Sequence, residues 1–212
     1  MQISEADFFV RLATKDRYTV VFDIETGPGD AGLLEKLFAP PADLPEVGEF
    51  DESAVKVGNL KDPAKIAAKI WDEQEKHRQA GKDWDANNKA AKAAAWDEFV
   101  NEAPKSALYG RVVAVGYGFF DEKKELSTYI DIAADEQQML ARFWRMIVEV
   151  RRRMNNVITH NGHNFDLPFM KRRAFVLGMR VPTLRTKYNK WEDIFLDTMV
   201  EWGSGEWKAY VK

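Results

Sequence analysis

The feature that most constrains the fold of this chain is a β-forming stretch that ends in two acidic residues. It runs from Tyr18 to Thr26 and reads Y-T-V-V-F-D-I-E-T. Aromatic and β-branched residues dominate its first five positions, which predicts a buried strand. Asp23 and Glu25 stand two residues apart, so an extended backbone points both carboxylates to the same face. The Gly-Pro-Gly run at 27–29 is expected to end the strand, which leaves both acids at its carboxyl end, where open α/β sheets place their sites.

Two carboxylates beside a core are costly unless a metal ion or another cation neutralises them. The pair also has a simpler interpretation as a strand end whose acids are solvated or hydrogen-bonded to backbone amides. A chain with this many Asp and Glu residues contains roughly one Asp-x-Glu triplet by chance. The choice between these interpretations depends on a second acidic group elsewhere in the chain.

The composition suits one domain, or one domain with a large insertion, because the chain has 212 residues. Its hydrophobic content of 45% is enough for a full core. The absence of Cys excludes disulfides, zinc–thiolate sites and thiol nucleophiles. The sequence shows neither a signal peptide nor an apolar run long enough to span a bilayer. We therefore expect a cytoplasmic protein without a membrane partner.

The charge is unevenly distributed along the chain. Residues 1–140 carry 17 Lys and Arg against 27 Asp and Glu, whereas residues 141–212 carry 14 against 7. The basic C-terminal third indicates either a surface for polyanions or a set of solvated helix faces. The run from Arg151 to Arg153 has the same two interpretations, since arginines at a helix end complement the helix dipole or bind phosphate.

Residues 27–106 differ in character from the rest and are predicted to be a helical insertion after the first strand. The segment is rich in proline at first and then in Lys, Glu and Ala. Asp62 is expected to cap a helix that ends near Gly81, and a second helix is expected over Asp85–Ala103. No chemistry is assigned to this insertion.

The remaining elements predict a mixed α/β sheet. A capped amphipathic helix over Ser4–Leu12 precedes the first strand. The later elements are two antiparallel strands, a helix, a short strand and a last helix, over Arg111–Phe120, Leu126–Ile132, Asp135–Met154, Asn156–Thr159 and Leu167–Leu177.

Asp166 stands where the short strand passes to the last of these helices. By itself it has the interpretation of a helix N-cap. Together with Asp23 and Glu25 it indicates three carboxylates from two neighbouring strand ends that converge on a divalent metal, with oxygen ligands only.

Two motifs resemble those of the DEDD 3′-5′ exonucleases, the DnaQ-like branch of the ribonuclease H-like superfamily. F-D-I-E-T at Phe22–Thr26 resembles their first motif, and N-G-H-N-F-D-L-P at Asn161–Pro168 resembles their second. The form N-x-x-x-F-D-x-P is similar to that of the proofreading-exonuclease domains of family B DNA polymerases and their free-standing relatives. R-V-V-A-V-G at 111–116 and L-D-T-M at 196–199 also resemble this subgroup. The likeness covers roughly residues 17–27 and 107–202.

The resemblance implies a ribonuclease H-like mixed sheet of about five strands, one of them antiparallel, flanked by helices. It also implies a single exonuclease-like domain over residues 1–212, interrupted by the insertion at 27–106.

The same resemblance implies two-metal phosphodiester hydrolysis with Mg²⁺ or Mn²⁺. The substrate would be the 3′ end of single-stranded DNA, with RNA as the other option. The implied catalytic residues and metal ligands are Asp23, Glu25 and Asp166. The implied substrate-binding residues are Ile24, Thr26, Asn161 and Phe165, and further candidates to contact the strand are Tyr188, Trp191, Trp202, Lys187 and Lys190, with core packing as the other interpretation of the tryptophans.

The chain departs from the family in one respect, because the fourth Asp and its accompanying base are not found. We expect that this chain lacks the C-terminal motif that carries them. Weaker candidates to fill these roles are Asp193, Asp197, His160 and His163, and at least one of the histidines is expected to be structural.

Three hypotheses about function remain open from sequence. The first is a metal-dependent 3′-5′ exonuclease, associated with a DNA polymerase or a repair complex. The second is a catalytically inactive ribonuclease H-like module that binds nucleic acid or a polymerase. The third is a metal-dependent endonuclease of the same fold.

Overall fold

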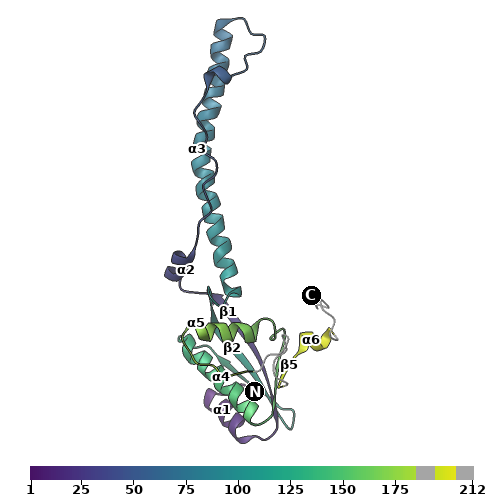
Figure 1. The fold of residues 1–212 in the computed structure, drawn as a ribbon. Helices are drawn as coiled ribbons and strands as arrows, with labels where there is room; N and C mark the ends of the chain where they lie inside the picture. Colours follow the sequence, from purple (N-terminus) through teal and green to yellow (C-terminus); the bar gives the residue numbers. More distant parts are fainter. Residues whose placement is uncertain (185–193, 204–212) are drawn as a thin grey trace. The chain divides into compact units, whose positions relative to one another are not determined.

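A five-stranded mixed sheet organises the part of the chain that contains the motifs (Figure 1). The computed structural model describes residues 1–184 and 194–203. The sheet order is β3-β2-β1-β4-β5; β2 is antiparallel to both of its neighbours, and β1, β4 and β5 are mutually parallel. The strands are β1 (Tyr18–Pro28), β2 (Gly110–Asp121), β3 (Leu126–Asp131), β4 (Asn156–Thr159) and β5 (Phe195–Asp197). The expected ribonuclease H-like architecture, with one antiparallel strand, is confirmed.

Helices flank the sheet, and their starts follow the capping signals in the sequence. Ser4 accepts a hydrogen bond from the backbone N–H of Asp7 at 3.1 Å, and Asp135 accepts one from Gln137 at 2.9 Å. Each cap satisfies a backbone donor that the first turn of its helix leaves free. The helices of this part are α1 (Glu5–Thr14), α2 (Ala31–Leu37), η2 (Ala103–Lys105), α4 (Glu136–Arg152), α5 (Asp166–Val176) and α6 (Thr198–Trp202).

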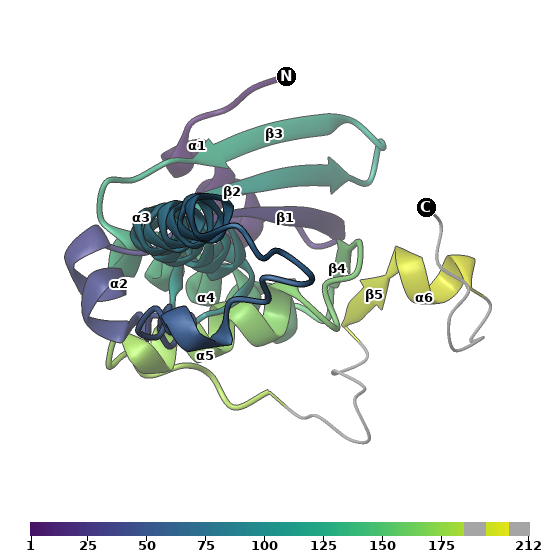
Figure 2. The same ribbon diagram turned by 90° about the horizontal axis from the view of Figure 1, so that it is seen from above.

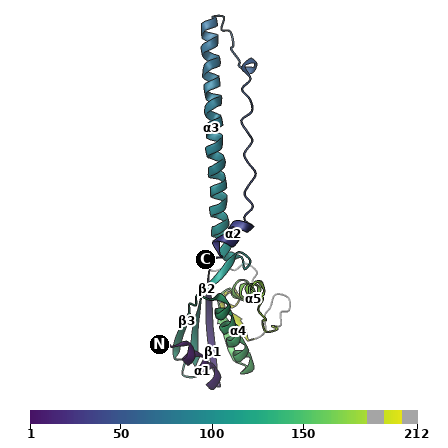
Figure 3. The same ribbon diagram turned by 90° about the vertical axis from the view of Figure 1, so that its left-hand side faces the viewer.

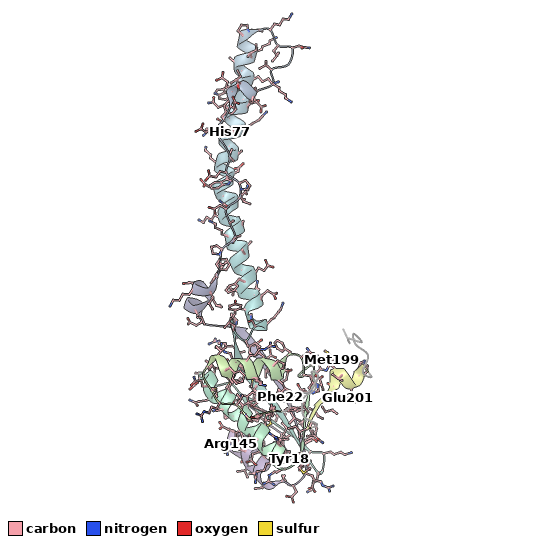
Figure 4. All side chains as sticks on the ribbon, in the orientation of Figure 1. Tyr18, Phe22, His77, Arg145, Met199 and Glu201 are labelled. Carbon is pink, nitrogen blue, oxygen red and sulfur yellow. The ribbon has the colours of Figure 1, made fainter. Side chains whose placement is uncertain are left out.

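The core lies between the sheet and helices α1, α4 and α5. Figure 2 shows α4 and α5 on the same side of the strands. Phe8 of α1 packs against Tyr117 and Phe119 of β2, and Phe143 of α4 packs edge-on against Phe22 of β1. These three helices therefore cover the same face of the sheet, and every second residue of β1 points into that core. Tyr18 and Phe22 are among the buried residues (Figure 4).

The first strand is longer than the sequence predicts. We expected it to end near Thr26, but β1 continues to Pro28, which pairs with Gly110. The register with β2 shifts between Glu25 and Thr26. Such an irregularity takes up an extra residue and lets pairing resume beyond it. Asp23 and Glu25 consequently lie inside the strand rather than at its end.

The chain divides into two compact units, Met1–Leu34 with Glu102–Lys212, and Glu35–Asn101. The second unit falls within the expected insertion at 27–106. That the first unit and the insertion form one exonuclease-like domain remains a prediction.

One long helix dominates the second unit, and the prediction of two helices separated near Gly81 is wrong. Helix α3 runs from Pro63 to Glu102 without interruption. A glycine inside a helix costs only about 1 kcal/mol relative to alanine, and the Lys, Glu and Ala residues on both sides favour helix enough to offset it. Although α3 is long, no helix in the described parts of the chain is apolar enough over its length to cross a membrane.

An extended segment runs back along α3 in the second unit (Figure 3). Phe38 packs against Trp96, and the backbone N–H of Leu44 donates to Asn88 at 2.8 Å. Phe50 contacts the ring of His77, whose centroid lies 5.5 Å away. As the residue number rises from Phe38 to Phe50, the number of the α3 residue in contact falls from Trp96 to His77, so the two segments run antiparallel. This segment, which includes a short 3₁₀ turn at η1 (Glu52–Ala54), is therefore held along α3 by mixed aromatic and polar contacts.

Candidate active site

The two acids of the first motif project from the face of β1 opposite the helices. Asp23 and Glu25 are exposed, whereas Phe22 and Ile24 are buried. Their cross-strand partners on β2 are Gly116 for Asp23 and Ala114 for Glu25. Because these partners are small, the neighbouring strand places no bulky side chain directly opposite the two acids.

Asp166 enters the same region from the first turn of α5. Its side chain is only 3% exposed, and it accepts hydrogen bonds from the backbone N–H of Ile24 and from the Thr159 hydroxyl, the latter at 3.5 Å. Burial and, to a smaller extent, the nearby charge of Asp23 together raise the pKa of the Asp166 carboxyl to about 6. The N-cap position belongs to Phe165, so helix capping does not account for Asp166. The structure thus brings Asp23 and Asp166 together.

A compact turn between β4 and α5 positions Asp166. Asn161 adopts a left-handed conformation with φ of 60°, which asparagine tolerates better than most residues. Its carbonyl oxygen accepts hydrogen bonds from the backbone N–H groups of Asn164 and Phe165, at 3.1 and 3.0 Å. A Cβ on Gly162 would lie 2.2 Å from the side chain of Thr159, so only glycine fits at this position of the turn.

Asp197 anchors this turn to the next strand. Its carboxylate is 1% exposed and accepts hydrogen bonds from the backbone N–H groups of Asn161 at 2.8 Å, His163 at 2.9 Å and Met199 at 3.0 Å. Met199 lies in the first turn of α6, a helix that also carries Glu201 (Figure 4). This set of donors favours a structural role for Asp197 over that of a fourth metal ligand.

The two histidines of the second motif have different surroundings. His160 is exposed, and its Nδ1 lies 2.9 Å from the Thr198 hydroxyl. His163 is partly buried, with Nδ1 4.0 Å from a carboxylate oxygen of Asp197. Burial lowers the pKa of His163 below its ordinary value, although the charge of Asp197 opposes the change. A neutral, packed His163 fits the structural role expected for at least one of the pair.

The residues implied to bind substrate occupy mixed positions. The side chain of Ile24 faces the core, and its backbone N–H donates to Asp166. Thr26 lies just beyond the register shift and is half-buried. Phe165 is partly buried and packs against Phe169 with ring centroids 5.6 Å apart. Trp202 is 74% exposed, so core packing does not explain it.

Several predicted residues fall outside the described parts of the chain. They are Asp193, Tyr188, Trp191, Lys187 and Lys190.

The arginines at the end of α4 make contacts within the protein. Arg153 donates to the carbonyl oxygens of Ala13 and Lys15 at the end of α1. Arg151 donates to the carbonyl of Thr183 at 3.0 Å. These contacts favour the structural interpretation of this basic run over phosphate binding.

The carboxylates of Asp23 and Asp166 suit a hard divalent cation, although no third ligand lies with them among the described residues. Within residues 1–184 and 194–203, no three His, Asp or Glu side chains form a group that could hold a metal ion. Asp23 and Asp166 nevertheless place two carboxylates near each other, one of them buried. A cation would offset both the burial of the Asp166 carboxylate and its repulsion by Asp23, which together raise its pKa, so the chemistry of these residues fits Mg²⁺ or Mn²⁺.

Sequence reasoning missed Thr159 and the anchoring role of Asp197. Thr159 ends β4 and contacts Asp166 across seven residues of chain. Its signal is its place at the end of the strand before the acidic motif, combined with the glycine at 162, whose lack of a Cβ leaves room for the Thr159 side chain.

Comparison with known proteins agrees with this geometry. Residues 105–198 match a family described as a predicted 3′-5′ exonuclease related to the exonuclease domain of PolB. This part of the chain is therefore similar to a PolB-like 3′-5′ exonuclease domain. The match includes the second motif and β5, and it begins beyond β1 and its two acids.

Individual relatives are DNA polymerases. The DNA polymerase of Thermococcus litoralis is 31% identical over 84 residues, which cover 37% of this chain and 5% of the polymerase. The DNA polymerase of Pyrococcus glycovorans is 37% identical over 60 residues, which cover 28% of this chain and 8% of the polymerase. DNA polymerase 1 of Pyrococcus abyssi is 35% identical over 54 residues, which cover 26% of this chain and 7% of the polymerase. The chain therefore spans less than a tenth of the length of these relatives.

Proposed function

We propose that this PolB-like domain is a metal-dependent 3′-5′ exonuclease that releases nucleotides from single-stranded DNA ends. The observation that carries the proposal is the buried carboxyl of Asp166 beside Asp23, whose pKa is raised to about 6 by its burial and by the charge of Asp23. Carboxylates whose pKa is raised by burial and by a like charge cluster at functional sites. DNA is the proposed substrate because the similar proteins are DNA polymerases.

Asp23, Glu25 and Asp166 would hold two Mg²⁺ or Mn²⁺ ions. When bound, such ions supply Lewis-acid stabilisation of the phosphoryl oxygens and a water of lowered pKa. The contribution of the chain is to fix the acids before substrate arrives. The β1 backbone sets the common direction of Asp23 and Glu25, and hydrogen bonds from Ile24 and Thr159 hold Asp166.

The turn between β4 and α5 would receive the terminal nucleotide. Asn161 has a left-handed backbone in this turn and its side-chain oxygen accepts a hydrogen bond from the Asn164 side chain at 3.2 Å, and Phe165 offers a partly buried aromatic ring. Aromatic side chains bind single strands by stacking on bases without strong sequence preference. A polymerase or a repair complex is the proposed partner, since the similar proteins are DNA polymerases with much longer chains.

The direct test is nucleotide release from a single-stranded DNA labelled at its 5′ end, with Mn²⁺ present. Asp23→Ala is expected to abolish release, because it removes the acid that couples to Asp166. Asp16→Ala is the matched control, since the Asp16 side chain is 92% exposed and lies away from the motifs.

Two results would contradict the proposal. Equal nucleotide release by Asp23→Ala and the parent chain would mean that the acidic site does not catalyse the reaction. Salt-dependent strand binding with no cleavage in any metal would favour an inactive nucleic-acid-binding module instead. Blocking the 3′ end separates the endonuclease hypothesis, because only an endonuclease still cuts a blocked strand.

A further inference from the structure

A groove lies beside the candidate active site, between α5 and the segment that leads into β2. Its volume is about 350 Å³, within the range of roughly 300–1,000 Å³ typical of ligand sites. One wall is the outer face of α5 with Phe165, Phe169 and Arg172, and the other is formed by Lys105 and Leu108. These residues have no part in the metal site.

The walls of the groove are held in place by a buried ion pair. Arg173 of α5 donates to both carboxylate oxygens of Glu136, at 2.8 and 2.9 Å. The same arginine contacts the carbonyl oxygen of Ala107 at 3.3 Å, and Glu136 accepts the backbone N–H of Val112 at 2.8 Å. Segment 105–108 is thereby fixed against α5. A groove formed in advance binds a ligand without the entropic cost of ordering its walls.

The chemistry of the lining suits a nucleotide. Phe165 is partly buried and Leu108 is 51% exposed, which gives a base an apolar surface. Lys105 and Arg172 are exposed cations, and no carboxylate lines the groove. Lys105 contacts Glu102 at 2.5 Å, whereas Arg172 has no ion-pair partner among the residues that the structure describes. An unpaired guanidinium beside an apolar surface is suited to bind phosphate next to a base.

The groove adjoins the acidic site along the chain, because Phe165 lines it and Asp166 is the next residue. We propose that the groove binds the nucleotide adjacent to the terminal one in a single strand, with its base against Phe165 and Leu108 and its phosphate on Arg172. This inference rests on the proposed function, since it takes the scissile phosphate to lie at Asp23 and Asp166. It assigns substrate contacts to Leu108 and Arg172, which lie outside both motifs.

The test is the affinity of the full chain for 5′-fluorescein-labelled phosphorothioate oligothymidylates in Ca²⁺, measured by anisotropy in a series of salt concentrations. Loss of one phosphate contact lowers the salt slope by about 0.7, which corresponds to roughly fivefold in affinity at 0.1 M salt. Arg172→Glu is therefore expected to raise the Kd for an eight-residue strand by at least that factor. Arg180→Glu is the matched control, because Arg180 is also exposed and lies outside the groove.

Strand length locates the contact. Competition by unlabelled thymidine monophosphate should be unaffected by Arg172→Glu, because a single nucleotide occupies only the acidic site. Equal Kd values for Arg172→Glu and Arg180→Glu would overturn the inference, as would an equal effect of Arg172→Glu on the mononucleotide and the strand.

The failure of this inference and the failure of the exonuclease proposal are distinguishable. If the groove is not a substrate contact, Arg172→Glu binds strands normally while nucleotide release still depends on Asp23. If the exonuclease proposal is wrong, release does not depend on Asp23, whatever Arg172→Glu does to binding.

Discussion

Asp166 and Asp197 each lie where a parallel strand leads into a helix, but the groups around their carboxylates differ. Asp197 ends β5, is buried, and accepts hydrogen bonds from three backbone N–H groups. Asp166 follows β4, is equally buried, and lies near the charge of Asp23, with its pKa raised to about 6. Thus Asp197 stabilises the fold, whereas the charged form of Asp166 destabilises it.

The difference lies in the partners of each carboxylate rather than in burial. A carboxylate that fills its acceptor sites with backbone donors is stable where it is. A carboxylate that faces another acid is costly at neutral pH unless a cation joins it. We therefore infer that Asp197 stabilises the turn between β4 and α5 and that Asp166 is a metal ligand.

The largest expected effect is the loss of stability in Asp197→Ala. Three partly buried backbone donors would lose their acceptor, which is expected to lower the free energy of unfolding by about 2–4 kcal/mol. Urea unfolding followed by circular dichroism measures this change. Asp197→Asn keeps one acceptor oxygen and should lose less stability. If Asp197→Ala unfolds at the same urea concentration as the parent, the structural role assigned to Asp197 is wrong.

Asp166→Asn is expected to act in the opposite direction. The amide removes a buried charge that repels Asp23, so the metal-free variant should be more stable than the parent at pH 7.5. The upper limit, from a pKa of about 6 against an ordinary value near 3.9, is on the order of 3 kcal/mol. The same urea experiment in the presence of EDTA measures it.

The pH dependence provides the control for Asp166→Asn. Between about pH 4 and pH 6, the folded parent holds a proton on Asp166 that the unfolded chain has lost, so the stability of the parent falls as pH rises. The advantage of the variant should therefore be small near pH 4 and reach its full size above pH 6. An advantage that does not change with pH would mean that the charge of Asp166 is not its origin.

The sequence predicts this contrast only in part. The cap at Ser4 and the spacing of Asp23 and Glu25 follow from local patterns, and the structure shows this cap. The proximity of Asp166 to Asp23 depends on β4 pairing with β1, which local patterns do not specify. The donors around Asp197 likewise depend on the register of β4 and β5.

Two elements show where local patterns mislead. Gly81 predicts a break in α3, but a single glycine costs less than its helix-forming neighbours contribute. The Gly-Pro-Gly run at 27–29 predicts the end of β1, but a register shift after Glu25 lets the strand continue to Pro28. In both cases the cooperativity of a long element outweighs one unfavourable residue.

The most direct test of the central claim is Mn²⁺ binding, followed by electron paramagnetic resonance of the free ion. The loss of a residue that only supports a ligand weakens metal binding roughly 10–100-fold, so the loss of a ligand should cost at least that much. We predict that Asp166→Asn loses Mn²⁺ affinity by this factor, whereas Asp197→Asn, if folded, keeps the affinity of the parent. Equal Mn²⁺ affinity in Asp166→Asn and the parent would contradict the assignment of Asp166 to a metal site.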